Sequence, residues 1–198
     1  RQSHPYMILL VSIGLAIVVA LLLGGRLIGL ARVPFRLGWL AFLALGLQVA
    51  AVFSSNTTWL PLAMLVGSYL LLLAVILANI RTPGIALLGL GLVANMAVIA
   101  ANGGFMPVTV EAVSHAGLEH LITTTDSGRV FGSKDIVLPY SDTRLWVLSD
   151  IIVIRKPTPA VLSLGDLMLA GGAFWFTLAS MCSERRGRAA RSDSEAGQ

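Results

Sequence analysis

Long apolar runs alternate with short polar connections along most of this chain. Five of these runs are long enough to be membrane helices, and they lie near 7–25, 37–53, 59–78, 84–101 and 161–182. A helix rises about 1.5 Å per residue, so about 20 apolar residues cross the roughly 30 Å hydrocarbon core of a bilayer. The runs are apolar on every side, and a soluble domain of this length cannot bury five such helices. The pattern therefore predicts an all-α integral membrane protein, a bundle of five transmembrane helices.

The five runs leave room for one further unit, the segment 102–160 between the fourth and fifth spans. The composition agrees with this division, because 56% of the residues are hydrophobic and only 12% are charged. We expect residues 1–182 to form a single membrane domain, in which segment 102–160 is partly helical and lies outside the membrane. The polar, charged tail 183–198 is predicted to be disordered.

Arginines in the connections predict the orientation. They occur in the first connection, in the third and in the tail, as Arg26, Arg32, Arg36, Arg81, Arg185, Arg186, Arg188 and Arg191. The second connection, 54–58, has no charge. Because basic residues in short loops stay on the cytoplasmic side, we expect the N-terminus outside, the C-terminus in the cytoplasm and segment 102–160 outside the cytoplasm. The net charge of +4 then reflects topology, so the lipid bilayer is an expected partner and nucleic acid is not.

Polar residues are rare within the predicted spans. Gln48 and Asn95 are expected to form hydrogen bonds between helices, and Gly46 and Gly91 beside them favour close helix approach. Asp166 has two interpretations that can hold together. In the first, Ser163-Leu-Gly-Asp166 is a capping box, in which the serine hydroxyl and the aspartate carboxylate each accept from a backbone amide of the first turn. In the second, Asp166 is a proton or ligand site, because ionisable groups beside the membrane are functional candidates.

The extracytoplasmic segment opens with Asn102-Gly-Gly-Phe-Met-Pro107. Glycines permit positive φ and proline stops a helix, so this stretch is predicted to turn the chain and to pack Met106 back onto the bundle. Two short helices are expected next, at 109–122 and at 143–152. The second contains Asp150 and is too short to span a bilayer, so we expect it to lie at the membrane interface or to re-enter the membrane.

Three ionisable residues, Glu111, His115 and Glu119, fall on one face of the helix predicted at 109–122. A row of carboxylate, histidine and carboxylate is one way to bind a divalent metal. Surface pairs at four-residue spacing explain the row as well, and no further His or Cys cluster supports a metal. We therefore expect no metal and no cofactor.

Four motifs carry a resemblance to a known family. They are Asn102-Gly-Gly-Phe-Met-Pro107, Asp150-Ile-Ile, Pro157-x-Pro159 and Ser163-Leu-Gly-Asp166. Together they resemble a family of small bacterial integral-membrane proteins known only as a domain of unknown function. The resemblance implies a helical membrane fold and a location in the bacterial inner membrane, and it implies no activity.

Three functions remain open at this point. The leading hypothesis is a non-enzymatic protein that binds a ligand or partner, or serves as an accessory subunit of a membrane complex or a homo-oligomer. Its outer face would use five residues at the outer ends of the last two spans, namely Asn102, Met106, Pro107, Asp150 and Asp166. The alternatives are a small-solute or proton-coupled transporter and an extracytoplasmic enzyme with Asp150 and Asp166 as an acid–base pair. No residue is assigned a catalytic role.

Overall fold

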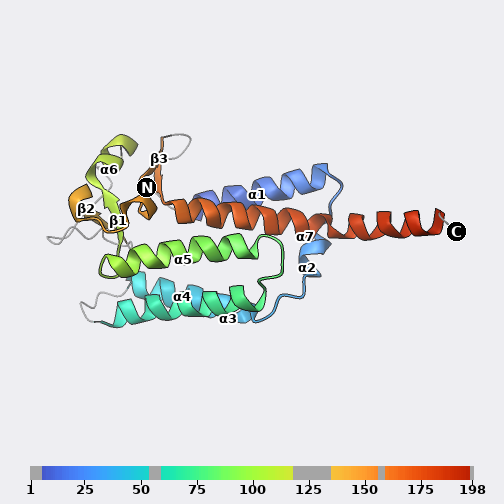
Figure 1. Ribbon diagram of the computed structural model, residues 1–198, viewed down its shortest axis with the longest axis horizontal. Coiled ribbons are helices and arrows are strands. Elements are labelled where there is room, and N and C mark those ends of the chain that lie inside the picture. Colours follow the sequence, from blue (N-terminus) through green and yellow to red (C-terminus); the bar gives the residue numbers. More distant parts are fainter. Residues whose placement is uncertain (1–5, 54–58, 118–134, 156–158, 197–198) are drawn as a thin grey trace.

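The computed structural model describes residues 6–53, 59–117, 135–155 and 159–196. Most of these residues are helical, in five long helices and two short ones. The long helices run alternately in opposite directions, so that the connections gather at the two ends of a bundle (Figure 1). The helices are α1 (Tyr6–Leu22), α2 (Ile28–Ala31), α3 (Gly38–Phe53), α4 (Leu60–Ala78), α5 (Ile85–Ala101), α6 (Val110–Ala116) and α7 (Leu164–Ala196).

The long helices lie in a row whose order differs from the order in the sequence. Helix α7 packs between α1 and α5, while α4 packs between α5 and α3 (Figure 1). The short helix α2 rests against α7. Helix α5 is therefore the middle of the row. Helices α5 and α7, which we call the central helices, come from the two sides of the long segment 102–160.

The apolar runs of the sequence coincide with these long helices to within a few residues at most ends. Two of the helices are long and apolar enough to cross a membrane, α4 and the Leu164–Ser183 part of α7. Three shorter apolar stretches accompany them, Met7–Leu22, Gly38–Ala51 and Ile85–Ala101. The apolar runs form helices because apolar side chains offer the backbone no hydrogen-bond partners, and a helix pairs its backbone groups within itself.

Glycines bring α5 and α7 into close contact. A Cβ added at Gly172 of α7 would lie 2.6 Å from the backbone nitrogen of Leu88, and one added at Gly91 of α5 would lie 2.5 Å from the carbonyl oxygen of Gly165. Such distances allow backbone to pack on backbone. The predicted close approach at Gly91 is therefore confirmed. The one expected at Gly46 is wrong, because a Cβ there meets no atom within 4 Å.

The segment between α5 and α7 contains four short strands, β1 (Met106–Thr109), β2 (Asp135–Leu138), β3 (Ile152–Ile154) and β4 (Ala160–Leu162). Strand β1 pairs in parallel with β2, and β3 pairs with β4 as an antiparallel hairpin. A further parallel bridge joins Val108 of β1 to Asp150. Two 3₁₀ turns, η2 (Tyr140–Asp142) and η3 (Trp146–Leu148), lie between β2 and β3.

The turn predicted after the fourth span is confirmed, since Gly103 and Gly104 have φ of 71° and 95°. The helix predicted at 143–152 is wrong. This stretch forms η3 and the start of β3 instead, because backbone pairing with Pro107 and Leu162 satisfies Asp150 and Ile151. The helix predicted at 109–122 is α6, which ends at Ala116 because Gly117 adopts a left-handed conformation with φ 69°.

Glu119 and Pro157 lie outside the described residues. The tail also differs from the expectation of disorder, because α7 continues as a helix to Ala196 (Figure 1). Its stretch 184–191 contains four Arg and two Ala, which have high helix propensity, and that propensity favours a helix.

Candidate functional site

A hydrogen-bonded cluster of three side chains joins α5 to the start of α7. The backbone amide of Asp166 donates to Ser163 Oγ at 3.0 Å, and the amide of Ser163 donates to Asp166 Oδ2 at 3.2 Å. These are the two bonds of the predicted capping box, and α7 begins at Leu164. The carboxylate also lies at the positive end of the helix dipole, which stabilises its charge.

Asn95 of α5 completes this cluster. Its Nδ2 donates to Asp166 Oδ1 at 2.8 Å, and its Oδ1 accepts from Ser163 Oγ at 2.9 Å. Asn95 and Ser163 are buried, while Asp166 is half-buried. Gly165 makes room for the amide, because a Cβ at this position would collide with Asn95 Oδ1. The interhelical bond predicted for Asn95 is therefore present, and Gln48 lies half-buried on α3.

Asn102 connects the end of α5 to the described part of segment 102–160, which we call the outer segment because it lies at one end of the bundle (Figure 1). Its Oδ1 accepts from the backbone amide of Arg144 at 2.9 Å, and its Nδ2 donates to the carbonyl oxygens of Arg144 at 2.9 Å and of Val98 at 2.8 Å. One side chain thus binds both backbone groups of a residue 42 positions away. This arrangement fixes the turn η3 against the helix end.

Met106 and Pro107 are part of the core of the protein. Each is almost completely inaccessible to solvent, and Met106 packs in a hydrophobic cluster with residues of α4 and α5. The carbonyl oxygen of Pro107 accepts from the amide of Asp150 at 3.2 Å. Asp150 is itself buried, with 7% of its surface exposed.

The five residues proposed from the sequence therefore fall into two groups. Asn102, Met106, Pro107 and Asp150 meet where the outer segment leaves α5, whereas Asp166 binds Asn95 and Ser163 at the start of α7. Both groups hold the segment onto the bundle.

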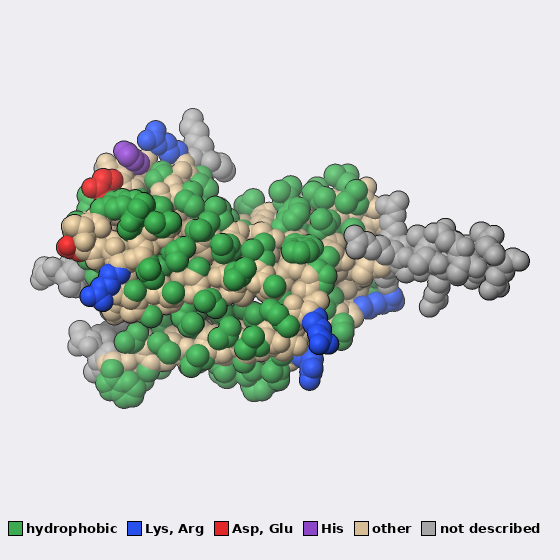
Figure 2. Space-filling view, in the orientation of Figure 1, with side chains coloured by type: hydrophobic (Ala, Val, Ile, Leu, Met, Phe, Trp, Pro, Cys, Tyr) green, Lys and Arg blue, Asp and Glu red, His purple; other side chains and the backbone are tan. Residues whose placement is uncertain are grey.

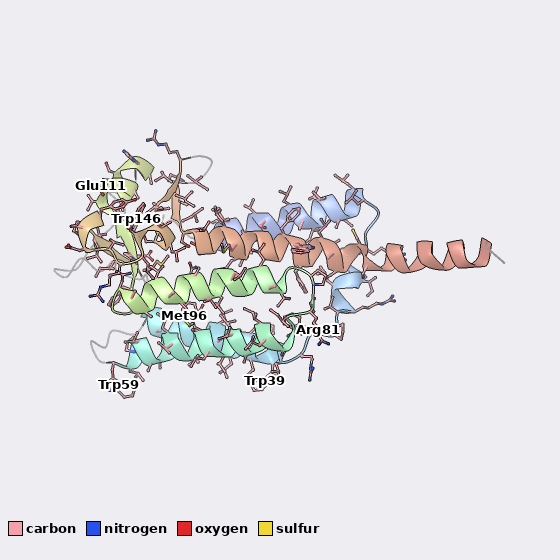
Figure 3. The ribbon with its side chains drawn as sticks, viewed as in Figure 1. Trp39, Trp59, Arg81, Met96, Glu111 and Trp146 are labelled. Atoms are coloured by element: carbon pink, nitrogen blue, oxygen red, sulfur yellow. The ribbon has the colours of Figure 1, made fainter. Side chains whose placement is uncertain are left out.

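Charged and polar side chains reach solvent on the far side of the outer segment. Glu111 and His115 are exposed on α6, and Arg155 Nε donates to the carbonyl oxygen of His115 at 2.9 Å. Figure 3 shows Glu111 at the end of the molecule that is remote from Arg81. Within the described ranges, no group of three or more His, Cys, Asp or Glu side chains is placed to hold a metal ion.

One structural contact could not be predicted from the sequence. Asn79 at the end of α4 binds Arg36 just as Asn102 binds Arg144: its Oδ1 accepts from the Arg36 amide at 2.8 Å, and its Nδ2 donates to the Arg36 carbonyl oxygen at 2.7 Å. The sequence does show that Asn79 directly follows a long apolar run, at a place where the last carbonyl groups of a helix lack partners. That signal does not identify the distant residue.

The fold and the site define a class: a mainly helical protein with helices suited to a membrane and a compact outer segment fixed between its two central helices. The comparison with protein families gives the particular family. Residues 32–178 match the model of the family of unknown function DUF5317, so the chain belongs to that family, and the resemblance to a domain of unknown function is confirmed. No curated protein and no solved structure matches the chain.

Proposed function

We propose that this protein is a five-span protein of the bacterial inner membrane whose outer segment binds a partner or small ligand without catalysing a reaction. The observation that carries the membrane assignment is the apolar lateral surface. In α4, only 17% of the residues in the most apolar stretch are buried, and Leu62, Val66, Leu70 and Leu77 are exposed. Contiguous exposed apolar surface on this scale favours lipid as the surrounding solvent.

The three shorter helices fit the same proposal. Helix α5 has 17 residues, which corresponds to a length of about 25 Å. A span a few ångströms shorter than the hydrocarbon core is accommodated by local thinning of the bilayer or by flanking residues, at a fraction of a kcal/mol per ångström. All five long helices are therefore assigned as spans.

The distribution of charge supports an orientation with the outer segment outside the cytoplasm. Figure 2 shows Lys and Arg side chains at both ends of the bundle, whereas the acidic and histidine side chains on this face lie only at the end that carries the outer segment. Basic residues in short loops mark the cytoplasmic side. This gives an N-terminus outside and a C-terminus in the cytoplasm.

The binding function is supported by how the outer segment is held. Hydrogen bonds from Asn102 and the capping box at Ser163 tie it to both central helices, and the bridge between Val108 and Asp150 joins two parts of the segment itself. A segment fixed in this way presents a preorganised surface, which reduces the entropy lost on binding. The exposed side chains of α6, including Val110 and Glu111, lie on that surface.

The test is site-specific photo-cross-linking in native membranes. A photoreactive residue at Glu111 is expected to form one defined adduct, whereas the same residue at Leu70 in the middle of α4 is expected to label lipid. Native mass spectrometry of the complex purified in mild detergent then gives its mass and stoichiometry. If Glu111 and Leu70 label the same mixture, or if only the bare chain is recovered, the binding proposal is refuted.

Transport is a second candidate, favoured by the cluster of Asn95, Ser163 and Asp166 between two apolar helices. Polar groups in such a position are used in ion and proton pathways. Proteoliposomes with a trapped pH dye give the test. A proton flux that is lost in Asp166→Asn but kept in Asp142→Asn, an exposed carboxylate of the turn η2, would establish transport and displace the binding proposal.

A further inference from the structure

The two asparagine contacts described above are the same device at two places in the chain. Asn79 binds the backbone of Arg36 and Asn102 binds the backbone of Arg144, each through one amide oxygen and one amide nitrogen. The separations are 43 and 42 residues. In each case the same nitrogen also donates to a carbonyl oxygen four residues earlier in its own helix, at 2.8 Å. We call these two arrangements the amide clamps.

In each amide clamp, the residue directly after the bound arginine is a leucine in a strained conformation. Leu37 after Arg36 has φ 58°, and Leu145 after Arg144 has φ 54°. They are the two non-glycine residues of the described chain with positive φ. A left-handed conformation is strained for a residue with a Cβ and persists only where the surroundings fix it. The clamp supplies that constraint by binding both backbone groups of the preceding arginine.

The strained leucines turn apolar side chains outward at the start of a helical turn. Leu37 directly precedes α3, which begins with Gly38 and Trp39, and Leu145 directly precedes η3, which begins with Trp146. The side chains are strongly exposed, at 44% for Leu37, 65% for Trp39, 49% for Leu145 and 45% for Trp146. Both arginine side chains are exposed as well. The same order of arginine, leucine and tryptophan thus stands on the surface twice.

The two copies lie toward opposite ends of the bundle. Trp146 lies at the end that carries the outer segment, and Trp39 lies toward the other end, near Arg81 (Figure 3). The apolar surface continues from each copy onto exposed neighbours, Val147 at 52% beside Trp146 and Phe42 at 79% beyond Trp39. A single protein partner would not present the same chemical groups at both ends of the bundle. A bilayer presents the same groups at each of its faces, in the order phosphate, polar–apolar boundary and acyl chain.

We propose that the two clamped segments, Arg36–Trp39 and Arg144–Trp146, are phospholipid anchors, one in each leaflet. The guanidinium binds lipid phosphate, the indole occupies the interface and the leucine enters the upper acyl region. Two anchors held to the bundle by amide clamps fix the depth and tilt of the helices in the membrane. This proposal rests on the membrane assignment under Proposed function.

The test uses tryptophan as its own probe. Two variants are prepared in vesicles of phosphatidylcholine with a minor share of phosphatidylglycerol, one retaining only Trp146 and one retaining only Trp39, with the other tryptophans replaced by Phe. Quenching is measured with nitroxide on the lipid headgroup, with nitroxide deep in the acyl chain, and with aqueous acrylamide. We expect both tryptophans to be quenched most strongly by the headgroup nitroxide and weakly by acrylamide.

The amide clamps provide matched controls for each other. Asn102→Ala is expected to abolish the shallow quenching of Trp146 and to leave Trp39 unchanged, while Asn79→Ala has the reverse effect. Each asparagine change is made in both single-tryptophan variants, so the variant whose quenching stays the same reports that the change has not unfolded the protein. If acrylamide quenches Trp146 and lipid nitroxide does not, or if Asn102→Ala leaves Trp146 unchanged, the anchor proposal is overturned.

A spin label at Leu70→Cys separates failure of the anchors from failure of the membrane assignment. Oxygen accessibility typical of the acyl core at this position, together with a solvent-quenched Trp146, refutes the anchors alone. A water-accessible label at Leu70 refutes the membrane bundle itself. Neither result depends on the identity of a binding partner.

Discussion

Adding one methyl group at Gly172 gives a quantitative test of how α5 and α7 pack. The Cβ of alanine at this position would lie 2.6 Å from the backbone nitrogen of Leu88, about 0.8 Å inside the 3.4 Å at which ordinary contact begins. The obstructing atom belongs to the backbone, so no side-chain rotation relieves the overlap. The two central helices must separate, or α7 must shift along its axis.

The expected cost follows from two opposing terms. Overpacking a close contact costs about 1–3 kcal/mol. Replacing glycine by alanine within a helix returns up to about 1 kcal/mol of helix propensity. The neighbouring Gly171 isolates the first term, because its added Cβ meets only the flexible side chain of Leu87, at 3.4 Å. Gly171→Ala should therefore be neutral or stabilising, and the two variants should differ by about the full packing cost of 1–3 kcal/mol.

The assay is reversible unfolding in mixed micelles of dodecylmaltoside with increasing sodium dodecyl sulfate, followed by far-UV circular dichroism. We expect Gly172→Ala to unfold at a lower fraction of the denaturing detergent than Gly171→Ala. Equal stability of the two variants, within the about 0.5 kcal/mol typical of surface substitutions, would refute the close packing of α5 against α7.

Three further predictions use the same framework. Ser163→Ala removes both the helix cap and the hydroxyl that donates a hydrogen bond to Asn95. It should lower the free energy of unfolding in the same assay by about 1–2 kcal/mol. Leu70→Arg places a charge in the middle of the exposed face of α4, and it should oppose membrane insertion by about 2.5–3.5 kcal/mol in a glycosylation-based insertion assay. If this face met water instead, the change would be nearly neutral. Met106→Ala empties a fully buried site and should destabilise the protein by about 2–5 kcal/mol, with faster hydrogen exchange in the strands β1 and β2.

Local patterns in the sequence were enough to predict the long helices and the cap of α7. An apolar run can satisfy its backbone only as a helix when lipid surrounds it, so hydropathy locates α1, α3, α4, α5 and the start of α7. The capping box needs only residues 163 and 166, which are three positions apart. Both features depend on neighbours in the chain, and both are present.

The outer segment and the amide clamps could not be predicted in this way. Strand β1 pairs with β2, which comes after α6, so that Met106 lies opposite Asp135. The residues from Trp146 to Leu148 turn rather than continue a helix because Asn102 holds Arg144 from 42 residues away. Apolar and polar alternation in 143–152 fits an amphipathic helix equally well. Tertiary contacts decide such short segments, and a single sequence does not display those contacts.

The order of helices in the row has a consequence for biosynthesis. Helix α7 fills the place between α1 and α5, yet it is the last of the long helices to leave the ribosome. Until it arrives, α1 lacks the neighbour that buries its inner face, including the small, fully buried Ala16 and Ala20. In the proposed membrane bundle, a nascent chain that stops before residue 164 would leave α1 without its main packing partner. Completion of the bundle is thus coupled to completion of the chain.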